Sequence, residues 1–392
     1  MSTPTGAGVE PFRIAVPDLV LDDLRERLRR TRWPERETVE DWSQGVPLAY
    51  LRDLCAYWAD GYDWRVREAR LNALSQVRTR IGGLGIHAVH VRSSHPGALP
   101  LVVTHGWPGS FAELAKVVGP LADPPAHGGD AADAFHVVCP SLPGYGFSDR
   151  PSHPGWGVER IAEAWIELMS RLGYDRFGAQ GGDWGVSVSS AIGQAAPDRV
   201  VGLHLNPPLA APDPATLDQL TDGEQAALAD LERANRWESG YAELQATRPQ
   251  TIGYSLVDSP AGLCAWIVEK FRAWTDCDGQ PENVLDRDEM LDDVTIYWVT
   301  GTGASSARLY WESFRQVSRT FGDEVVDTVP VPTGGSIFPR EMPRPSRRWA
   351  ARRYPDLRYW NEVDRGGHFA AFEQPELFVD EVRAFFRLVR DG

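Results

Sequence analysis

Cysteine, methionine and lysine are all scarce in this sequence of 392 residues. The four cysteines are widely scattered, with neither a C-x-x-C pair nor the spacing of a metal site, so no disulfide framework or zinc module is predicted. We expect free thiols in a reducing compartment, the cytoplasm. Only two of the 40 basic residues are lysines, a bias that is typical of a GC-rich bacterial gene.

Long apolar runs are also missing. No stretch approaches the roughly 18 consecutive apolar residues of a membrane span, and residues 1–10 lack the basic and apolar regions of a secretion signal. We therefore expect a soluble protein with no membrane partner. The net charge of −15 disfavours nucleic acid and anionic lipid as partners and favours a small neutral or apolar molecule.

The hydrophobic pattern predicts an α/β protein with a mostly parallel sheet covered by helices on both faces. Short apolar strands alternate with helical segments; the expected strands are Leu99–His105, Phe135–Pro140, Arg176–Gly182, Val200–Leu205, Val329–Thr333 and Leu357–Trp360. Between them, about 209–322 is helical and rich in Trp and Tyr. The predicted division is an N-terminal segment (1–94), a first core part (95–208), a helical cap (209–322) and a second core part (323–392).

The most informative motif is Gly181–Gly185, with the sequence GGDWG. A strand is predicted before it and a helix, Val186–Ala196, after it, which is the setting of a nucleophile elbow. Asp183 stands where serine stands in most such motifs. A carboxylate nucleophile suits displacement at a saturated carbon and gives an alkyl–enzyme ester that water must then cleave. For an isolated motif of this kind, the competing interpretation is a structural aspartate that caps the helix.

Two further residues complete a candidate triad in the chain order of the α/β-hydrolase fold: nucleophile, acid, base. His368 follows two glycines on a late loop and is the candidate base. Glu341 follows the penultimate predicted strand and is the preferred orienting acid. Asp364 is nearer to His368 in sequence but precedes it on the same loop, so it is the second choice.

A predicted oxyanion hole adjoins the nucleophile. The turn His105–Gly109 (HGWPG) ends a central strand, so it can aim the backbone N–H of Trp107 at the cleft beside the N–H of Trp184. The residues expected to shape the site without reacting are His105, Gly106, Pro108, Gly182 and Gly185.

The sequence resembles the microsomal-type epoxide hydrolase family over nearly its whole length. The motifs that carry the resemblance are His105–Ser110 (HGWPGS), Gly181–Gly185 (GGDWG), Glu238–Tyr241 (ESGY), Asp258–Gly262 (DSPAG), Glu269–Phe271 (EKF), Ile296–Trp298 (IYW), Ser305–Tyr310 (SSARLY), Phe338–Glu341 (FPRE) and Arg365–Phe372 (RGGHFAAF).

The resemblance implies an α/β-hydrolase fold with an inserted helical cap and an N-terminal meander. It places the nucleophile, acid and base on Asp183, Glu341 and His368, as the residues themselves do, and adds two cap tyrosines, Tyr241 and Tyr310, as acids at the epoxide oxygen. It implies neither metal nor cofactor. Membrane-bound relatives carry an apolar anchor ahead of the N-terminal segment, and we expect none here.

Two rival functions occur on the same scaffold. A haloalkane or haloacid dehalogenase uses the same aspartate, histidine and acid, but halide leaves without a proton and has no need of the tyrosine pair. A catalytically silent binding protein would be expected to have lost Asp183 or His368. For an epoxide hydrolase, the substrate class is a small apolar or aromatic epoxide, with detoxification or natural-product tailoring, for example of enediyne precursors, as its role; a homodimer is compatible with this type of enzyme.

Overall fold

The computed structural model describes residues 8–319 and 327–390. A nine-stranded sheet forms its centre, in the order β1-β2-β3-β5-β4-β6-β7-β8-β9. The strands are β1 (Val9–Phe12), β2 (Gln76–Ile81), β3 (Leu84–Val91), β4 (Leu99–Thr104), β5 (Phe135–Pro140), β6 (Phe177–Gly182), β7 (Val200–Asn206), β8 (Thr333–Ile337) and β9 (Leu357–Glu362). Neighbours among β1, β2, β3 and β5 pair antiparallel. From β5 onward in this order, β4, β6, β7, β8 and β9 each pair parallel with the strand before them. The predicted α/β class with a mostly parallel sheet is confirmed.

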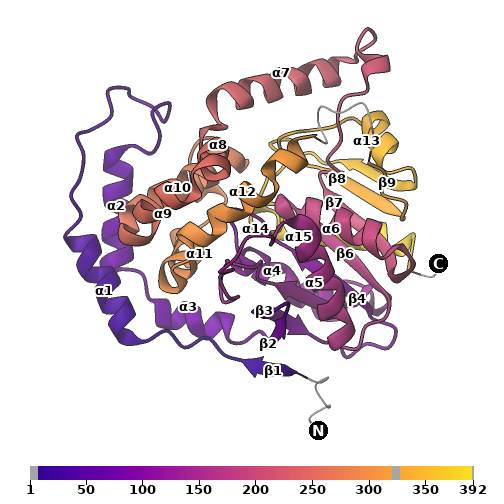
Figure 1. Cartoon of the computed structure of the whole chain (residues 1–392), viewed down its shortest axis with the longest axis horizontal. Coiled ribbons are helices and arrows are strands. Elements are labelled where there is room, and N and C mark those ends of the chain that lie inside the picture. The colour runs from indigo at the N-terminus through magenta and orange to yellow at the C-terminus, as the bar shows by residue number, and fades with distance from the viewer. Residues whose placement is uncertain (1–7, 320–326, 391–392) are drawn as a thin grey trace.

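Helices cover both faces of this sheet (Figure 1). A side chain at Gly202 of β7 would meet Phe385, whereas the adjacent Leu203 lies close to Gly193. Because successive residues of a strand point to opposite faces, the helices that carry Phe385 and Gly193 lie on opposite sides. The core helices are α4 (Ala115–Ala122), α5 (Val158–Arg171), α6 (Trp184–Ala195), α13 (Arg347–Arg353), α14 (Ala370–Glu373) and α15 (Pro375–Arg387).

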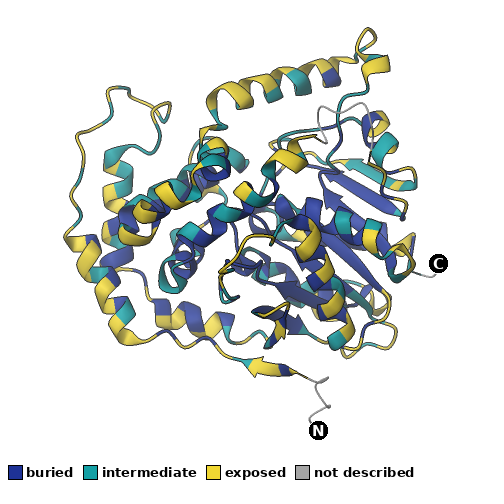
Figure 2. Cartoon of the chain, viewed as in Figure 1, coloured by how far each residue is buried: buried dark blue, intermediate teal, exposed yellow. Residues whose placement is uncertain are grey.

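Within the described residues, six α-helices lie between β7 and β8 in the chain and gather beside one end of the sheet (Figure 1). They are α7 (Asp222–Trp237), α8 (Gly240–Thr247), α9 (Pro249–Asp258), α10 (Pro260–Trp274), α11 (Arg287–Thr300) and α12 (Gly303–Arg319). Helix α7 is mostly exposed (Figure 2), and its buried Glu224 accepts hydrogen bonds from Arg348. The predicted boundary between residues 322 and 323 lies outside the described residues.

The N-terminal segment packs against these inserted helices. Its own helices are α1 (Asp18–Arg29), α2 (Leu48–Asp60) and α3 (Trp64–Leu71). The indole N–H of Trp58 donates to Thr295 of α11 at 2.9 Å, and the hydroxyl of Tyr62 donates to Asp292 at 2.7 Å. The guanidinium of Arg67 pairs with the same aspartate. These buried polar contacts are directional, so they fix α11 against the N-terminal segment.

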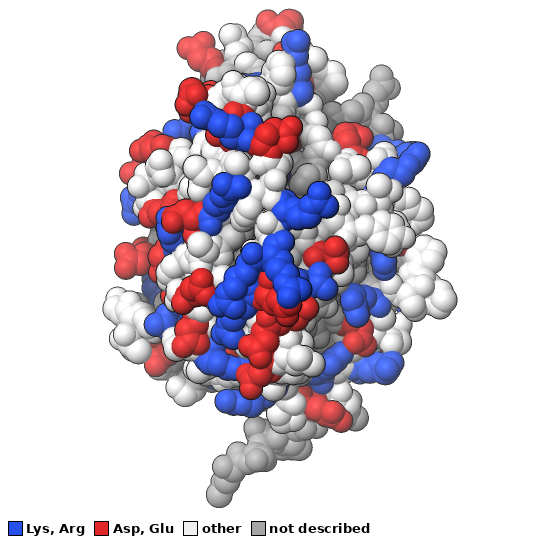
Figure 3. Space-filling view, turned by 90° about the vertical axis from the view of Figure 1, so that its left-hand side faces the viewer, with Lys and Arg blue, Asp and Glu red and all other residues white. Residues whose placement is uncertain are grey.

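The outer surface of α1 and α2 carries charges of both signs. Figure 3 shows that blue and red side chains alternate over this face. Arg27 pairs with Asp23 at 2.9 Å and Arg29 pairs with Asp60 at 2.6 Å. Both of these arginines therefore have an acidic neighbour, which is typical of a solvated face.

Strand β8 differs from the sequence-based expectation. It spans Thr333–Ile337, whereas Val329–Thr333 was predicted, so that prediction was wrong by about four residues. Pro330 and Pro332 cannot donate hydrogen bonds to a ladder, which moves the strand onward. The strand contains Gly334, where a side chain would come within 2.4 Å of Phe385. Close packing of the C-terminal helix thus selects a segment with little β-propensity.

Candidate active site

Asp183 stands at the turn between β6 and α6 with a φ of +50°. A Cβ at Gly181 would lie 2.0 Å from the carbonyl oxygen of Gly185, and a Cβ at Gly185 would lie 2.0 Å from that of Thr104. Only glycine permits this approach, so the turn can hold Asp183 in its strained conformation. The aspartate makes no side-chain cap hydrogen bond to α6. The competing interpretation of a helix-capping aspartate is therefore not what the structure contains.

The carboxylate of Asp183 points instead at the turn after β4. The backbone N–H of Trp107 donates to its Oδ1 at 2.8 Å. Gly106 makes room, since a Cβ there would lie 1.9 Å from Oδ1. Trp184 is the first residue of α6, and the N–H groups of a first helical turn have no partner within the helix. The N–H of Trp107 thus binds one carboxylate oxygen, and the N–H of Trp184, next in the chain to Asp183, has no partner within its helix.

The flanking residues of this turn hold it in place. The peptide bond between Trp107 and Pro108 is cis. The Nδ1 of the buried His105 lies 3.0 Å from the carbonyl oxygen of Gly106, and its Nε2 accepts the N–H of Leu142 at 3.3 Å. Burial lowers the pKa of His105 to about 4. With both ring nitrogens engaged by backbone, His105 acts on the shape of the turn. Gly182 likewise permits close packing, with the amide of a neighbouring asparagine 3.0 Å from its hypothetical Cβ.

His368 lies between two carboxylates. Its Nε2 lies 3.3 Å from Oδ2 of Asp183, and its Nδ1 lies 2.8 Å from Oε1 of Glu341. The N–H of Met342 also donates to this oxygen of Glu341 at 2.8 Å, which orients the acid. By contrast, the carboxylate of Asp364 pairs with Arg365 on the surface. Of the two candidate acids, the structure brings Glu341 to His368.

The electrostatics of His368 depend on Asp183. Burial alone lowers the pKa of this histidine, but Glu341 and Asp183 raise it well above its ordinary value. The imidazole is consequently protonated while both neighbours are charged. Conversion of Asp183 to a neutral ester would remove one of the two stabilising charges and lower the pKa of His368. His368 can therefore lose its proton and act as a base once Asp183 has become an ester.

Tyr241 of α8 and Tyr310 of α12 reach the site from the inserted helices. The ring of Tyr241 stacks on Trp107 with centroids 4.9 Å apart, and the ring of Tyr310 meets Trp184 edge-on at 4.9 Å. The two tyrosine rings are 5.8 Å apart. Burial raises the pKa of both phenols. For Tyr241 the charge of Asp183 raises the pKa further, and for Tyr310 both Tyr241 and Asp183 do so. Both hydroxyls stay protonated at neutral pH and can donate a proton to an oxygen anion.

Three residues of this site were missed by sequence reasoning. The ring of Trp274, at the end of α10, lies 4.8 Å from that of His368 and 5.3 Å from that of Tyr241. Asp276 accepts the N–H of Gly366 at 3.0 Å, and Glu373 accepts the N–H of Asp276 at 2.8 Å. No spacing rule links these positions, because they meet only when the inserted helices dock on the late loops. The acidic residues flanking the GGHF segment were the only available signal.

No group of three or more His, Cys, Asp or Glu side chains able to hold a metal ion occurs within residues 8–319 and 327–390. His87 and His90 illustrate why: on β3 the first bonds Ser141 and the second bonds Tyr174, on different sides of the sheet.

Known proteins share both this sequence and this geometry. The family model for the epoxide hydrolase N terminus matches residues 9–114, and that for the alpha/beta hydrolase fold matches residues 100–255. The protein named "Putative epoxide hydrolase" of Stigmatella aurantiaca is 55% identical over 98% of this chain and 86% of its own length. Epoxide hydrolase 1 of Sus scrofa is 37% identical over 97% of this chain and 89% of its own. The chain belongs to the epoxide hydrolase family.

Solved structures of the epoxide hydrolase family agree with this fold. The juvenile hormone epoxide hydrolase of Bombyx mori superimposes with a TM-score of 0.89 at 31% identity, over 98% of this chain and 96% of that one. The Aspergillus niger epoxide hydrolase gives 0.87 at 31% identity, over 98% and 97%. The predicted α/β-hydrolase fold is confirmed, and this family member is a hydrolase enzyme. Among its described helices, none has the length and apolar character to cross a bilayer.

Proposed function

We propose that the enzyme adds water to an epoxide to give a vicinal diol through a covalent ester on Asp183. The observation that carries this proposal is the position of His368, with Nε2 3.3 Å from Asp183 and Nδ1 2.8 Å from Glu341, in a site where the nucleophile is a carboxylate. The assignment of Asp183, His368, Glu341, Tyr241 and Tyr310 as catalytic residues is part of this proposal.

In the first step, an oxygen of Asp183 attacks one epoxide carbon and the carbon–oxygen bond of the ring breaks. Tyr241 and Tyr310 hydrogen-bond the departing oxygen, and a phenolic proton passes to the alkoxide. Their aromatic contacts with Trp107 and Trp184, and the effect of the Asp183 charge on the pKa of both phenols, support this role. The product of this step is a hydroxyalkyl ester.

In the second step, water adds to the carbonyl carbon of the ester. The Nε2 of His368 takes the proton of the water, and Glu341 stabilises the imidazolium. The N–H groups of Trp107 and Trp184 bind the resulting oxyanion, each donor being worth about 3 to 4 kcal/mol in comparable sites. The diol oxygen leaves with the proton from His368. The second proton of the water, left on the Asp183 carboxyl, returns to the phenolate, which restores both the Asp183 carboxylate and the tyrosine.

The tyrosine pair separates this proposal from a dehalogenase. A halide ion leaves without a proton, whereas an epoxide oxygen must be protonated. Two buried phenols beside the nucleophile match the second requirement. Asp183 and His368 are both present and in contact, which is unfavourable to a catalytically silent binding protein.

A juvenile hormone epoxide hydrolase is among the similar structures, and four aromatic side chains, Trp107, Trp184, Tyr241 and Tyr310, pack together at the site. We therefore propose a small apolar or aromatic epoxide as substrate class. Detoxification or natural-product tailoring, a cytoplasmic location and a homodimer stay predictions. So does the division of the chain into segments 1–94, 95–208, 209–322 and 323–392.

A single turnover in oxygen-18 water tests the mechanism. Excess enzyme is mixed with styrene oxide, and label is located by mass spectrometry. The ester route predicts an unlabelled first diol and oxygen-18 in the peptide that contains Asp183. Label in the first diol would mean direct attack by water and would contradict the covalent mechanism. Asp183→Asn should abolish ester formation in the same assay.

A further inference from the structure

A small cavity lies against Asp183 and His368. Its volume is about 20 Å³, which suits a single water molecule. Its walls are Thr104, Gly106, Trp107, Gly109, Glu113, Leu114, Gln180, Gly182, Asp183, Asn206, His368, Phe369, Ala370, Ala371 and Phe378. Tyr241 and Tyr310 do not line it. The cavity is therefore separate from the place where an epoxide oxygen would meet its proton donors.

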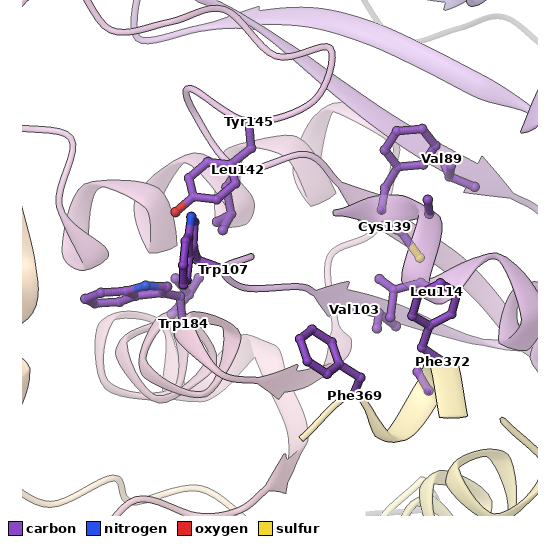
Figure 4. Close-up of a cluster of buried hydrophobic side chains, with 14 of the residues drawn as sticks. Val89, Val103, Trp107, Leu114, Cys139, Leu142, Tyr145, Trp184, Phe369 and Phe372 are labelled. Atoms are coloured by element: carbon purple, nitrogen blue, oxygen red, sulfur yellow. The ribbon is translucent and has the colours of Figure 1, made fainter. Parts of the chain in front are cut away.

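Charged side chains of this wall come from three different elements. Asp183 follows β6, His368 lies on the late loop, and Glu113 lies on the 3-10 helix Phe111–Leu114. Part of the remaining wall is apolar, with Leu114 and Phe369 on the side remote from Trp184 (Figure 4). A water needs two or more polar partners to be held in such a space, and these carboxyl and imidazole groups can supply them.

Glu113 is folded toward the reacting groups. Ser110 caps its short helix by accepting the N–H of Ala112. The glutamate side chain then bends back over Gly109, where a Cβ would lie 1.9 Å from Oε2 of Glu113. Gly109 belongs to the same turn as Trp107, the oxyanion donor. The absence of a side chain at Gly109 thus allows the carboxyl group to reach the cavity.

The surroundings of Glu113 differ from those of an ordinary helix glutamate. Burial raises the pKa of its carboxyl well above 4.5; the nearby Asp293 raises it further, His368 lowers it and Asp183 raises it. Burial also raises the pKa of Asp293, to about 8. Protonated or ionised, a carboxyl group keeps an oxygen that can accept a hydrogen bond. The second proton of a water near His368 therefore has an acceptor at any working pH.

We propose that Glu113 is a further catalytic residue, which holds the hydrolytic water in this cavity for attack on the Asp183 ester. The inference deepens the proposed function and rests on it. The water donates one proton to Nε2 of His368 and the other as a hydrogen bond to Glu113. Its oxygen forms the new bond to the ester carbonyl carbon as its first proton moves to His368. The bond to the diol oxygen then breaks, and that oxygen takes the proton from His368.

Pre-steady-state kinetics of the full-length enzyme test this role, with styrene oxide as the probe. Glu113→Leu removes the acceptor and should leave the rate constant of ester formation within about twofold, while ester hydrolysis slows about 100-fold because the water is misplaced. The ester on the Asp183 peptide should then accumulate. Glu113→Gln keeps a carbonyl oxygen and should stay within about tenfold of the unmodified enzyme. The matched control is Glu167→Leu on the exposed side of α5, which should change neither step.

A second variant reaches the cavity without altering Glu113. Ala371→Leu places extra methyl groups in the water space, so hydrolysis should slow while ester formation persists. This variant decides the question if Glu113→Leu does not fold. Equal losses in both steps, or an unchanged hydrolysis rate in folded Glu113→Leu, would overturn the role of Glu113. If Glu113→Leu does not fold, an unchanged hydrolysis rate in Ala371→Leu would overturn it. Failure of the unmodified enzyme to form an ester would contradict the proposed function instead, so the two failures are distinguishable.

Discussion

The backbone N–H of His368 donates a hydrogen bond of 2.9 Å to the carbonyl oxygen of Trp274, which ends helix α10. One inserted helix thereby contacts the loop of the candidate base directly. The Trp274 ring also touches that of Tyr241, so the proposed base and one proposed proton donor contact the same residue.

Asp276 continues the connection. Its carboxylate accepts the N–H of Gly366 at 3.0 Å and the Nε–H of Arg340 at 3.2 Å, so it joins the two loops that carry His368 and Glu341. We expect Asp276→Ala to lower the free energy of unfolding by about 1 to 3 kcal/mol. Ester hydrolysis should slow by about tenfold or more, because the base is less well placed. Chemical denaturation and single-turnover kinetics check both.

The control for Asp276 is Asp364→Ala, which removes an exposed carboxylate from the histidine loop. It should leave stability and both rate constants nearly unchanged. Equal behaviour of the two variants would show that the contacts of Asp276 with the two loops are dispensable.

Glu373 makes stability depend on pH. Burial raises the pKa of its carboxyl from 4.5 to about 7. Between these values the unfolded chain is ionised while the folded protein keeps its proton, so this group lowers the free energy of unfolding as pH rises through the window. Glu373→Gln cannot ionise, and its stability should gain about 3 kcal/mol relative to the unmodified enzyme across this range. Urea denaturation below, within and above the window measures the difference, and a constant difference would contradict the raised pKa.

The two phenols should act in the first chemical step. We expect Tyr241→Phe and Tyr310→Phe each to slow ester formation by about 10²- to 10³-fold, by comparison with the loss of one oxyanion donor. Thermal stability should change little. Stopped-flow tryptophan fluorescence can follow this step, since Trp107 and Trp184 contact the two rings.

Tyr145 offers the matched control for the phenols, since its buried hydroxyl donates to the carbonyl oxygen of Ser306 at 3.0 Å. Tyr145→Phe should lower stability by about 1 kcal/mol and leave ester formation unaltered. A full rate in either Tyr241→Phe or Tyr310→Phe would leave the other phenol as sole proton donor.

Gly106 should tolerate no side chain. An alanine Cβ at this position would lie 1.9 Å from Oδ1 of Asp183, so the carboxylate must move off the Trp107 N–H. Gly106→Ala should therefore lose about 100-fold or more in the rate of ester formation. Gly223 in α7 has no atom within 4 Å of its hypothetical Cβ, and Gly223→Ala should keep full activity and gain up to about 1 kcal/mol of stability.

Glu341 should set the basicity of His368. The carboxylate raises the pKa of this histidine against the effect of burial. In Glu341→Gln the imidazole should lose its proton at a lower pH, so the acid limb of ester hydrolysis moves to lower pH and the rate falls by about 10²-fold or more. The pH dependence of ester decay in single turnovers measures both effects. Glu381→Gln, at a buried carboxylate bonded to Ser336 and Asn361, should lower stability without moving this profile.

Much of the fold and the central motif could be read from local sequence. Continuous apolar segments predict buried parallel strands, and the glycines around Asp183 predict a tight turn, because both signals depend on residues adjacent in the chain. The bounds of strand β8 could not be predicted in this way. Its residues Thr333–Ile337 are chosen by close packing against Phe385, a long-range contact that no local pattern contains.

The sequence by itself determined that a carboxylate would replace serine at the elbow, and that a histidine and an acid would follow in the order of this fold. The sequence offered two carboxylates as the acid, with Glu341 preferred to Asp364, and the tertiary structure decided between them, because it brings Glu341 to His368 and leaves Asp364 with Arg365. It also decided the places of Glu113, Trp274 and Asp276. These residues come from separate segments, and their shared site exists only once burial of the apolar faces has brought the sheet, the late loops and the inserted helices together.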